Sequence, residues 1–195
     1  MRLVKQSVAD VQPITLADIK AQAYVTHSLD DAYLSACAAQ GLDQVASDTN
    51  RAMVDTTWVL TGAGFAPVIK LPRPPLIEVV SITYIDAAGA EQALPEAGYQ
   101  ITVSDVATFV QPAAGKQWPA TARGNANAVT VTYRSGYVQA DGEGGTTGAL
   151  PTAARHAALL WAAHLYQFRE AVTTGQTYQL PSYRALIAPL EVDLI

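Results

Sequence analysis

Hydrophobic residues at helical spacing mark the first predicted element. Leu16, Ile19 and Ala23 recur three and four positions apart, which is the spacing of one face of an amphipathic helix. Thr15 precedes them, and Asp18 follows Thr15 by three residues. A hydroxyl and a carboxylate at this spacing are typical of a capping box. The pattern therefore predicts a helix that begins after Thr15.

A second, longer helix is predicted from Ser28, as its cap, to about Asp48. Its apolar positions form two stripes, so we expect it to be covered on two sides. The first stripe contains Leu34, Ala38, Leu42 and Val45, and the second contains Leu29, Tyr33 and Cys37. Asp30 and Asp31 lie in the first turn, where the helix dipole favours negative charge. We interpret this acidic pair as structural rather than catalytic.

The middle of the chain has a different pattern, in which hydrophobic and polar residues alternate. β-Branched and aromatic residues are frequent there, and Gly, Pro, Asn and Asp separate the alternating runs. Such runs predict short strands with one buried face. The predicted strands cover residues 56–60, 67–71, 78–86, 99–104, 108–111 and 127–137. Several short strands with turns between them predict an antiparallel β-sandwich or small barrel.

Helical spacing returns near the C-terminus. Pro151 suits the first turn of a helix, and the apolar face of this helix contains Ala154, Ala158, Trp161, Leu165 and Phe168. A short terminal helix then carries an apolar face. That face consists of Tyr183, Leu186, Ile187 and Leu190. Pro189 is expected to end or distort its last turn, because proline cannot donate the helical hydrogen bond.

Together these elements predict an α+β protein with a β domain inserted into a helical core. The expected parts are an N-terminal helical pair (1–55), an inserted antiparallel β-sandwich or small barrel (56–138), a Gly-rich connection (139–150) and C-terminal helices that complete the helical core (151–195). The third helix is long and the fourth is short.

Composition and charge narrow the class of protein. The chain has 195 residues, of which 50% are hydrophobic and 15% charged, so we expect a folded core. Its formal charge of -5 argues against a dedicated nucleic-acid-binding domain, which would carry a basic patch. The single Cys37 excludes an internal disulfide. The longest apolar segment, residues 153–165, is too short and too polar to cross a membrane.

Catalytic and metal-binding patterns are sparse. The histidines are His27, His156 and His164. The last two are eight residues apart on one helix, which separates them by roughly 12 Å along the axis, too far for one metal ion. The Gly-rich loop lacks the G-K-[ST] ending of a phosphate-binding loop. We therefore expect no enzyme activity, no catalytic residues, no metal and no cofactor.

The stretch "KLPRPPL", residues 70–76, contains three prolines between two predicted strands. Pro72 and Pro75 satisfy the PxxP pattern of polyproline ligands. The flanking positions at which such ligands carry a basic residue are Ile69 and Ile77, so the charge pattern does not fit. We interpret the stretch as a rigid, extended crossover within the β domain, with Arg73 exposed.

The motifs, taken in order, resemble the head–tail connector (adaptor) proteins of long-tailed bacteriophages and related gene transfer agents. The resembling segments are residues 14–60, 69–90, 150–171 and 180–192. They include the helix pair, "LPRPPL" before the strand "VVSITYIDAAG", and the helix "AAHLYQFRE". Each motif is weak alone, and their combination over nearly the whole chain carries the resemblance.

The resemblance implies a structural protein of the virion neck, made in the cytoplasm of a host bacterium. Such proteins form a ring, typically of twelve copies, beneath the portal protein. The ring extends the DNA channel and docks a stopper or tail-completion protein. An acidic balance suits a channel through which DNA slides without sequence-specific binding. Two other hypotheses remain open: another neck or tail-completion protein, such as a stopper or tail terminator, or a small metal-binding enzyme.

The resemblance also suggests which residues make contacts. The face of Tyr183, Leu186, Ile187 and Leu190 is expected to dock on the portal, with packing on the chain's own core as the alternative. The candidate subunit contacts are Arg73, Tyr166, Arg169 and Glu170. Capping and surface pairing explain the last three as well.

Overall fold

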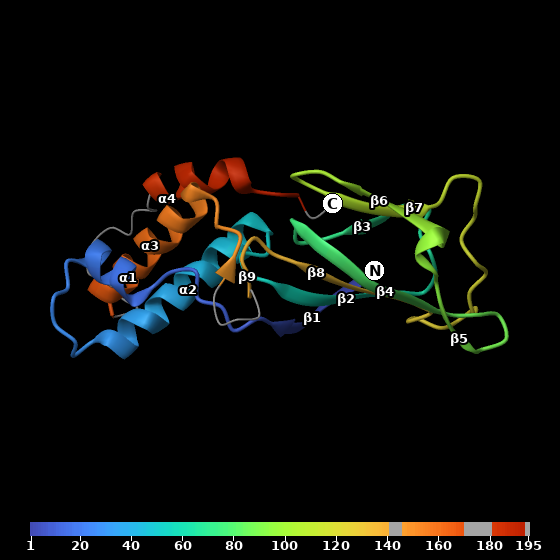
Figure 1. Cartoon of the computed structure of the whole chain (residues 1–195), viewed down its shortest axis with the longest axis horizontal. Helices are drawn as coiled ribbons and strands as arrows, with labels where there is room; N and C mark the ends of the chain where they lie inside the picture. Colours follow the sequence, from blue (N-terminus) through green and yellow to red (C-terminus); the bar gives the residue numbers. More distant parts are fainter. Residues whose placement is uncertain (141–145, 170–180, 194–195) are drawn as a thin grey trace.

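The computed structural model describes residues 1–140, 146–169 and 181–193. Helices gather at one end of an elongated molecule and strands at the other (Figure 1). The described residues are therefore α+β, with four helices and antiparallel sheets. Among the described helices, none is long and apolar enough to span a membrane.

The described residues of the helical unit form four helices. They are α1 (Leu16–Ala23), α2 (Asp31–Thr49), α3 (Thr152–Gln167) and α4 (Pro181–Ile187), followed by the 3-10 turn η2 (Ala188–Leu190). The predicted capping box is confirmed: the Asp18 N–H donates to Thr15 Oγ1 at 3.2 Å, and the Thr15 N–H donates to Asp18 Oδ2 at 2.9 Å. The predicted distortion at Pro189 is confirmed by η2.

The start of α2 differs from the prediction. Its N-cap is Asp30, which makes no side-chain capping bond, and Ser28 lies in the turn before it. The Ser28 carbonyl there accepts a hydrogen bond from the Asp31 N–H at 3.4 Å. The prediction of Ser28 as the helix cap is thus wrong. The prediction that Leu29 belongs to an apolar stripe of the helix is also wrong, because Leu29 precedes the helix and is 91% exposed.

Helices α2 and α3 pack closely because small residues line their contact. A Cβ atom on Gly41 would lie 2.4 Å from the Ala158 carbonyl oxygen. The buried residues of α3 are Ala154, Ala157, Ala158, Leu159 and Ala162. Trp161 is only half-buried and Phe168 is 50% exposed. The buried face of α3 is therefore rotated from the predicted one, toward the alanines that fit beside Gly41.

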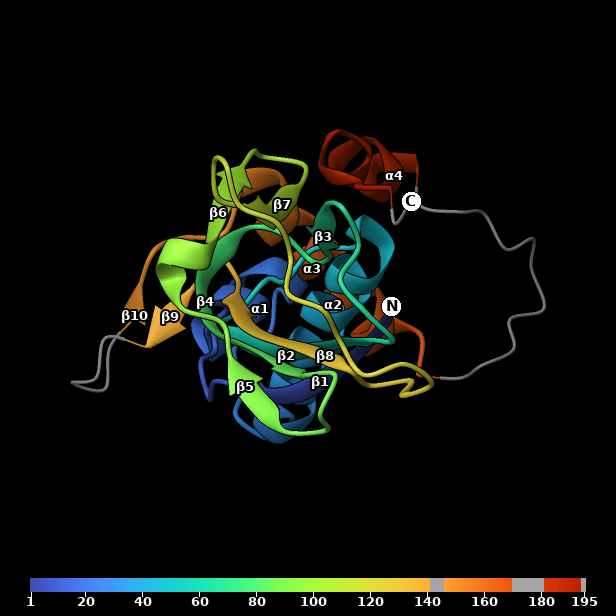
Figure 2. The ribbon, with the colours of Figure 1, turned by 90° about the vertical axis from the view of Figure 1, so that its right-hand side faces the viewer.

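The β unit contains two stacked sheets (Figures 1 and 2). The larger has the order β1-β2-β8-β4-β5 and the smaller β3-β7-β6, with antiparallel neighbours throughout. The larger sheet consists of β1 (Arg2–Val8), β2 (Thr56–Gly62), β8 (Val129–Ser135), β4 (Leu76–Ile85) and β5 (Glu91–Ala93). The smaller consists of β3 (Ile69–Leu71), β7 (Thr108–Pro112) and β6 (Tyr99–Val103). The remaining elements are η1 (Glu96–Gly98), β9 (Gln139–Ala140) and β10 (Thr146–Thr147).

The core of the β unit lies between these sheets. Its buried residues are Leu60, Ile69, Leu71, Ile82, Val110, Val129, Val131 and Tyr133. Burial alternates strictly along β8, as the sequence pattern predicted. No sheet formed by the described residues closes into a barrel, so the barrel alternative is wrong. A separate core, built mainly from α1–α4, fills the helical unit.

Strand β1 was not predicted from the sequence. It pairs antiparallel with β2 and forms one edge of the larger sheet. Six of its seven residues are exposed, so its sequence lacks the clear alternation that marks a half-buried strand. The chain therefore begins within the β unit before it enters the helices.

Candidate functional site

The helical and β units meet around Arg51, whose side chain is buried. Its Nε donates to the Leu190 carbonyl at 2.6 Å, and its Nη1 donates to the Asp105 carbonyl at 2.7 Å and the Tyr137 hydroxyl at 2.9 Å. These acceptors belong to η2, the β6–β7 turn and the segment after β8. Hydrogen bonds to a charged donor are strong, so Arg51 ties all three segments to the end of α2.

The segment after α4 lies across this junction. Asn50, in left-handed conformation at the end of α2, donates from Nδ2 to the Val192 carbonyl at 3.0 Å. The Val192 N–H donates to the Thr49 carbonyl at 3.0 Å, and Lys70 Nζ reaches the Asp193 carbonyl at 2.8 Å. The C-terminal segment is thus bonded to both units.

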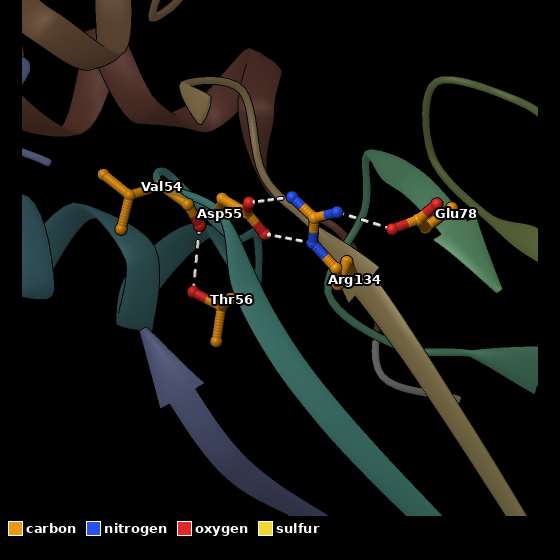
Figure 3. Close-up of polar contacts among 5 residues, drawn as sticks. All are labelled: Val54, Asp55, Thr56, Glu78 and Arg134. Carbon is orange, nitrogen blue, oxygen red and sulfur yellow. Dashed lines mark hydrogen bonds and ion pairs between the residues drawn. The ribbon is translucent and has the colours of Figure 1, made fainter. Parts of the chain in front are cut away.

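An ion-pair cluster reinforces the sheet side of the junction (Figure 3). Arg134 of β8 forms a bidentate ion pair with Asp55, in which its Nε donates to Oδ1 at 3.1 Å and its Nη2 donates to Oδ2. The Nη1 of Arg134 donates to Glu78 Oε1 at 2.5 Å. The Asp55 side chain is 9% exposed and that of Glu78 is 52% exposed. The hydrogen bonds to Asp55 and Glu78 raise the pKa of Arg134. The cluster is a structural clamp, and sequence reasoning missed it because its members are far apart in the chain.

Arg73 is not exposed, contrary to the prediction. It is half-buried with a φ of 63°, and its Nη1 donates to the Ala46 carbonyl of α2 at 2.9 Å. Its guanidinium carbon lies 5.8 Å from the centroid of the Trp58 ring, within the range of a cation–π contact. Burial lowers the pKa of Arg73. The residue joins the proline stretch to α2 and β2 of its own chain.

The proline stretch connects β3 to β4, which confirms its predicted position between strands. Its predicted extended conformation is wrong, because residues 73–75 form a bend. The Tyr133 hydroxyl donates to the Pro72 carbonyl at 2.8 Å from within the β core. The stretch is therefore bonded to the sandwich rather than free to bind a polyproline reader.

Tyr166 and Arg169 meet Asp30 at the outer end of the helical unit. The Tyr166 hydroxyl donates to Asp30 Oδ2 at 2.7 Å, and Arg169 Nη2 lies 3.2 Å from the same oxygen. The Arg169 guanidinium carbon also lies 4.6 Å from the centroid of the Tyr33 ring. The hydrogen bond from Tyr166 holds the pKa of Asp30 below its usual value. This cluster joins α3 to the start of α2; Glu170 lies outside the described residues.

The four predicted portal-docking residues of the C-terminal helix separate into two pairs. Tyr183 and Ile187 are buried in the chain's own helical core, while Leu186 and Leu190 are half-buried at its edge. The Tyr183 hydroxyl donates to Asp48 Oδ2 at 2.7 Å, and its ring centroid lies 5.2 Å from that of Trp161. Burial, followed by the bond to Asp48, raises the pKa of Tyr183. The structure thus anchors α4 through one pair and leaves the other partly accessible.

A groove of about 490 Å³ lies between α2 and the strands β1 and β2. We call it the junction groove. Its lining residues are Lys5, Val8, Ala39, Leu42, Asp43, Ala46, Ser47, Arg51, Ala52, Met53, Val54, Thr56, Trp58 and Arg73. Sequence reasoning did not find it, because it forms only where distant elements meet.

Metal-binding groups do not gather in the part of the chain that the structure describes. Within that part, no three His, Cys, Asp or Glu side chains are placed to hold a metal ion. Cys37 is buried in the helical core, and burial raises the pKa of its thiol, which makes it unreactive.

Comparison with known proteins gives a match in structure only. No protein-family model matches the chain, and no curated protein matches it in sequence. A chain in the neck of an empty gene transfer agent particle, computed with C6 symmetry, matches with a TM-score of 0.77 at 19% identity. A chain in the virion of the native particle matches with the same TM-score and identity. A chain in the neck of the native particle, computed with C12 symmetry, matches with a TM-score of 0.75 at 20% identity. Each match covers 100% of this chain and 97% of the other. The comparisons thus establish a shared fold over the whole chain.

Proposed function

We propose that this chain is a structural subunit of the neck of a phage-like particle, a head–tail connector (adaptor). One observation carries the proposal: its fold matches chains of gene transfer agent particles over 100% of its length, with TM-scores up to 0.77. The motif order found in the sequence points to the same class of protein. Fold alone does not fix function, but here a whole-chain fold match and a motif resemblance agree.

The subunit forms a ring of twelve copies beneath the portal protein and extends the DNA channel. The similar neck structures were computed with C6 and C12 symmetry, which supports a ring. In a ring, one surface of each subunit fits a different surface of its neighbour. The net charge of -5 suits a channel that repels DNA phosphates, so that DNA passes without being held.

The two ends of the ring contact different partners. The portal protein lies on one side and a stopper or tail-completion protein on the other. On the portal side, α4 docks through Leu186 and Leu190, while Tyr183 and Ile187 hold the helix on its own subunit. Subunit contacts involve the surroundings of Arg73 and the cluster of Tyr166 and Arg169. The protein is made in the host cytoplasm and resides in the virion neck.

Negative-stain imaging of the full chain mixed with portal-bearing heads tests this function. We expect rings that are coaxial with the portal and lie directly beneath it. A control sample of heads without portal should carry no rings. Binding only further down the tail would identify a tail terminator or stopper instead, and the absence of any binding to the neck or tail would overturn the proposal.

A further inference from the structure

The larger sheet of the β unit has two edges that the described residues leave open. β1 forms one edge and, among the described strands, pairs only with β2. At the opposite edge, β5 contacts β4 only from Ile82 to Ile85. Residues 76–81 of β4 therefore have β8 on one side and no described strand on the other. An open edge presents unpaired N–H and C=O groups that can bind a further strand.

Both edges also expose a large apolar side chain. Val4 of β1 is 42% exposed. Val80 of β4, at the register shift between Val79 and Ser81, is 54% exposed. Charged residues and bulges commonly protect a sheet edge from unwanted pairing, whereas an exposed valine gives no such protection. The two valines therefore favour a partner on each edge.

The two edges match in position and direction. Through the registers of the intervening strands, Val4 lies in one cross-strand row with Val59, Thr132 and Ser81. β1 and β4 run in opposite directions, because each of the three strand pairs that connect them is antiparallel. A second sheet placed beside the first in the same orientation would therefore set Val4 opposite Ser81 and next to Val80, in antiparallel pairing.

The charges of the two edges are complementary. Arg2 lies on β1 and Glu91 lies on β5, and both residues are exposed. Neither side chain has an ion-pair partner among the described residues. Arg2 shares its cross-strand row with Thr83 and Ala93, and Glu91 lies two positions from Ala93 on the same face. Long side chains at such a diagonal separation can interact, so Arg2 of a neighbouring sheet can reach Glu91.

The open stretches of β1 and β4 cannot pair within one chain. β2 and β8 lie between them (Figure 1), which separates them by roughly 14 Å at about 4.8 Å per strand. A second copy can bring its β4 edge to β1 without a change in either sheet. Because the two edges are different surfaces, each copy keeps one edge open for the next copy, as a closed ring requires.

We propose that β1 of one subunit pairs antiparallel with residues 76–81 of β4 in a second copy of this chain. The contact joins the larger sheets of the two subunits edge to edge. Val4 of one subunit packs against Val80 of the other, and Arg2 pairs with Glu91. Repetition of this contact closes the ring. The inference rests on the proposed function and names the subunit contact within the proposed ring.

Cross-linking between two single-site variants of the full chain tests the contact. Val4→Cys and Val80→Cys subunits are mixed, assembled on portal-bearing heads and treated with a short bismaleimide. Cys37 is buried, so the introduced thiols are the ones that react. We expect covalent dimers that contain one copy of each variant. Leu29→Cys, in the helical unit at a position 91% exposed, is the control and should form no dimer with Val4→Cys.

A charge exchange gives a second readout. Arg2→Glu and Glu91→Arg each place like charges at the contact, so we expect each to raise the chain concentration needed for ring formation by about threefold to tenfold. The two substitutions change the net charge in opposite directions, so net charge alone cannot explain a loss in both. The double variant restores opposite charges and should recover assembly. A double variant that assembles no better than the single variants would contradict the pairing of Arg2 with Glu91.

The possible results separate this contact from the proposed function. Rings that form without cross-links between positions 4 and 80 would overturn the contact but leave the proposed function intact. Cross-links from position 80 to the portal or to a tail protein, instead of to position 4, would also overturn the contact, because the β4 edge would then have another partner. A chain that binds to neither neck nor tail would overturn the proposed function, and the contact with it.

Discussion

Two arginines at the junction are stabilised in different ways. Arg51 is buried and, among the described residues, donates to two carbonyl groups and a hydroxyl. Arg134 instead pairs with two carboxylates, of which Asp55 is nearly buried and Glu78 is half-exposed. A buried carboxylate depends strongly on its partner, whereas an exposed one remains solvated by water. The two ion pairs of Arg134 should therefore contribute unequally to stability.

Replacement of Arg134 tests this asymmetry. Arg134→Met leaves Asp55 without its cation, and we expect the free energy of unfolding to fall by about 2–3 kcal/mol. This loss of stability is smaller than that expected for a fully buried ion pair, because the Arg134 side chain is 34% exposed. The matched control, Glu78→Gln, should cost only about 0–1 kcal/mol. Urea unfolding measures the stability of both variants. Equal losses of stability would contradict the unequal contributions of the two ion pairs.

The residues that sequence analysis placed correctly interact locally. Thr15 and Asp18 are three positions apart, so their spacing alone predicted both bonds of the capping box. Asp55 and Arg134 are 79 positions apart and meet only because β2 pairs with β8. Arg73 was expected to be exposed because a single sequence does not reveal that α2 passes beside it. Local chemistry is readable in the chain, and long-range pairing requires the fold.

Helix α4 presents two faces with different surroundings. Tyr183 and Ile187 face the helical core, and Leu186 and Leu190 lie half-buried at its edge. Arg51 and Asn50 hold the segment that follows. A helix fixed in this way can offer its second face to the proposed portal partner without leaving its own subunit.

Substitution on that second face tests its role in docking. Leu186→Glu introduces a charge where an apolar contact with the portal is proposed. We expect recruitment to portal-bearing heads to weaken by about tenfold or more, as expected for loss of one apolar anchor. Ala185→Glu adds the same charge at an exposed neighbouring position and should bind normally. Circular dichroism checks that both variants fold, and normal recruitment of a folded Leu186→Glu would refute the docking face.

Most elements were predictable because their periodicity reflects burial on one face. The six predicted strands correspond to β2, β3, β4, β6, β7 and β8. Strand β1 was missed because it is an exposed edge, and edge pairing leaves little hydrophobic signal. The face of α3 was misjudged because alanines, not its aromatic residues, fit against Gly41. The choice between sandwich and barrel depends on edge pairing, which periodicity does not encode.

The whole molecule combines two hydrophobic cores with a net negative charge. One core fills the helical unit and the other fills the sandwich. A subunit of the proposed DNA channel must not retain DNA, so the relevant property is its net charge rather than a single site. The formal charge of -5 therefore predicts weak interaction with duplex DNA.

Fluorescence anisotropy with a short labelled duplex measures this property. We expect no binding at low or physiological salt, whereas non-specific binders have a Kd of about 10⁻⁴–10⁻⁶ M. A triple variant, Asp10→Lys, Glu91→Lys and Glu96→Lys, changes three exposed residues and reverses the sign of the net charge. This variant should gain salt-dependent binding to the duplex and thereby serves as the positive control of the assay. Micromolar binding by the unmodified chain would contradict a repelling surface.

The position of β1 also restricts how this fold can be divided. β1 comes first in the chain and pairs with β2, yet α1 and α2 lie between them in sequence. The sandwich is therefore encoded in two separate pieces. A fragment that began at Thr56 would lack β1 and leave the edge of β2 unpaired, and unpaired sheet edges promote aggregation. Recombination between relatives would have to transfer β1 together with the rest of its sheet.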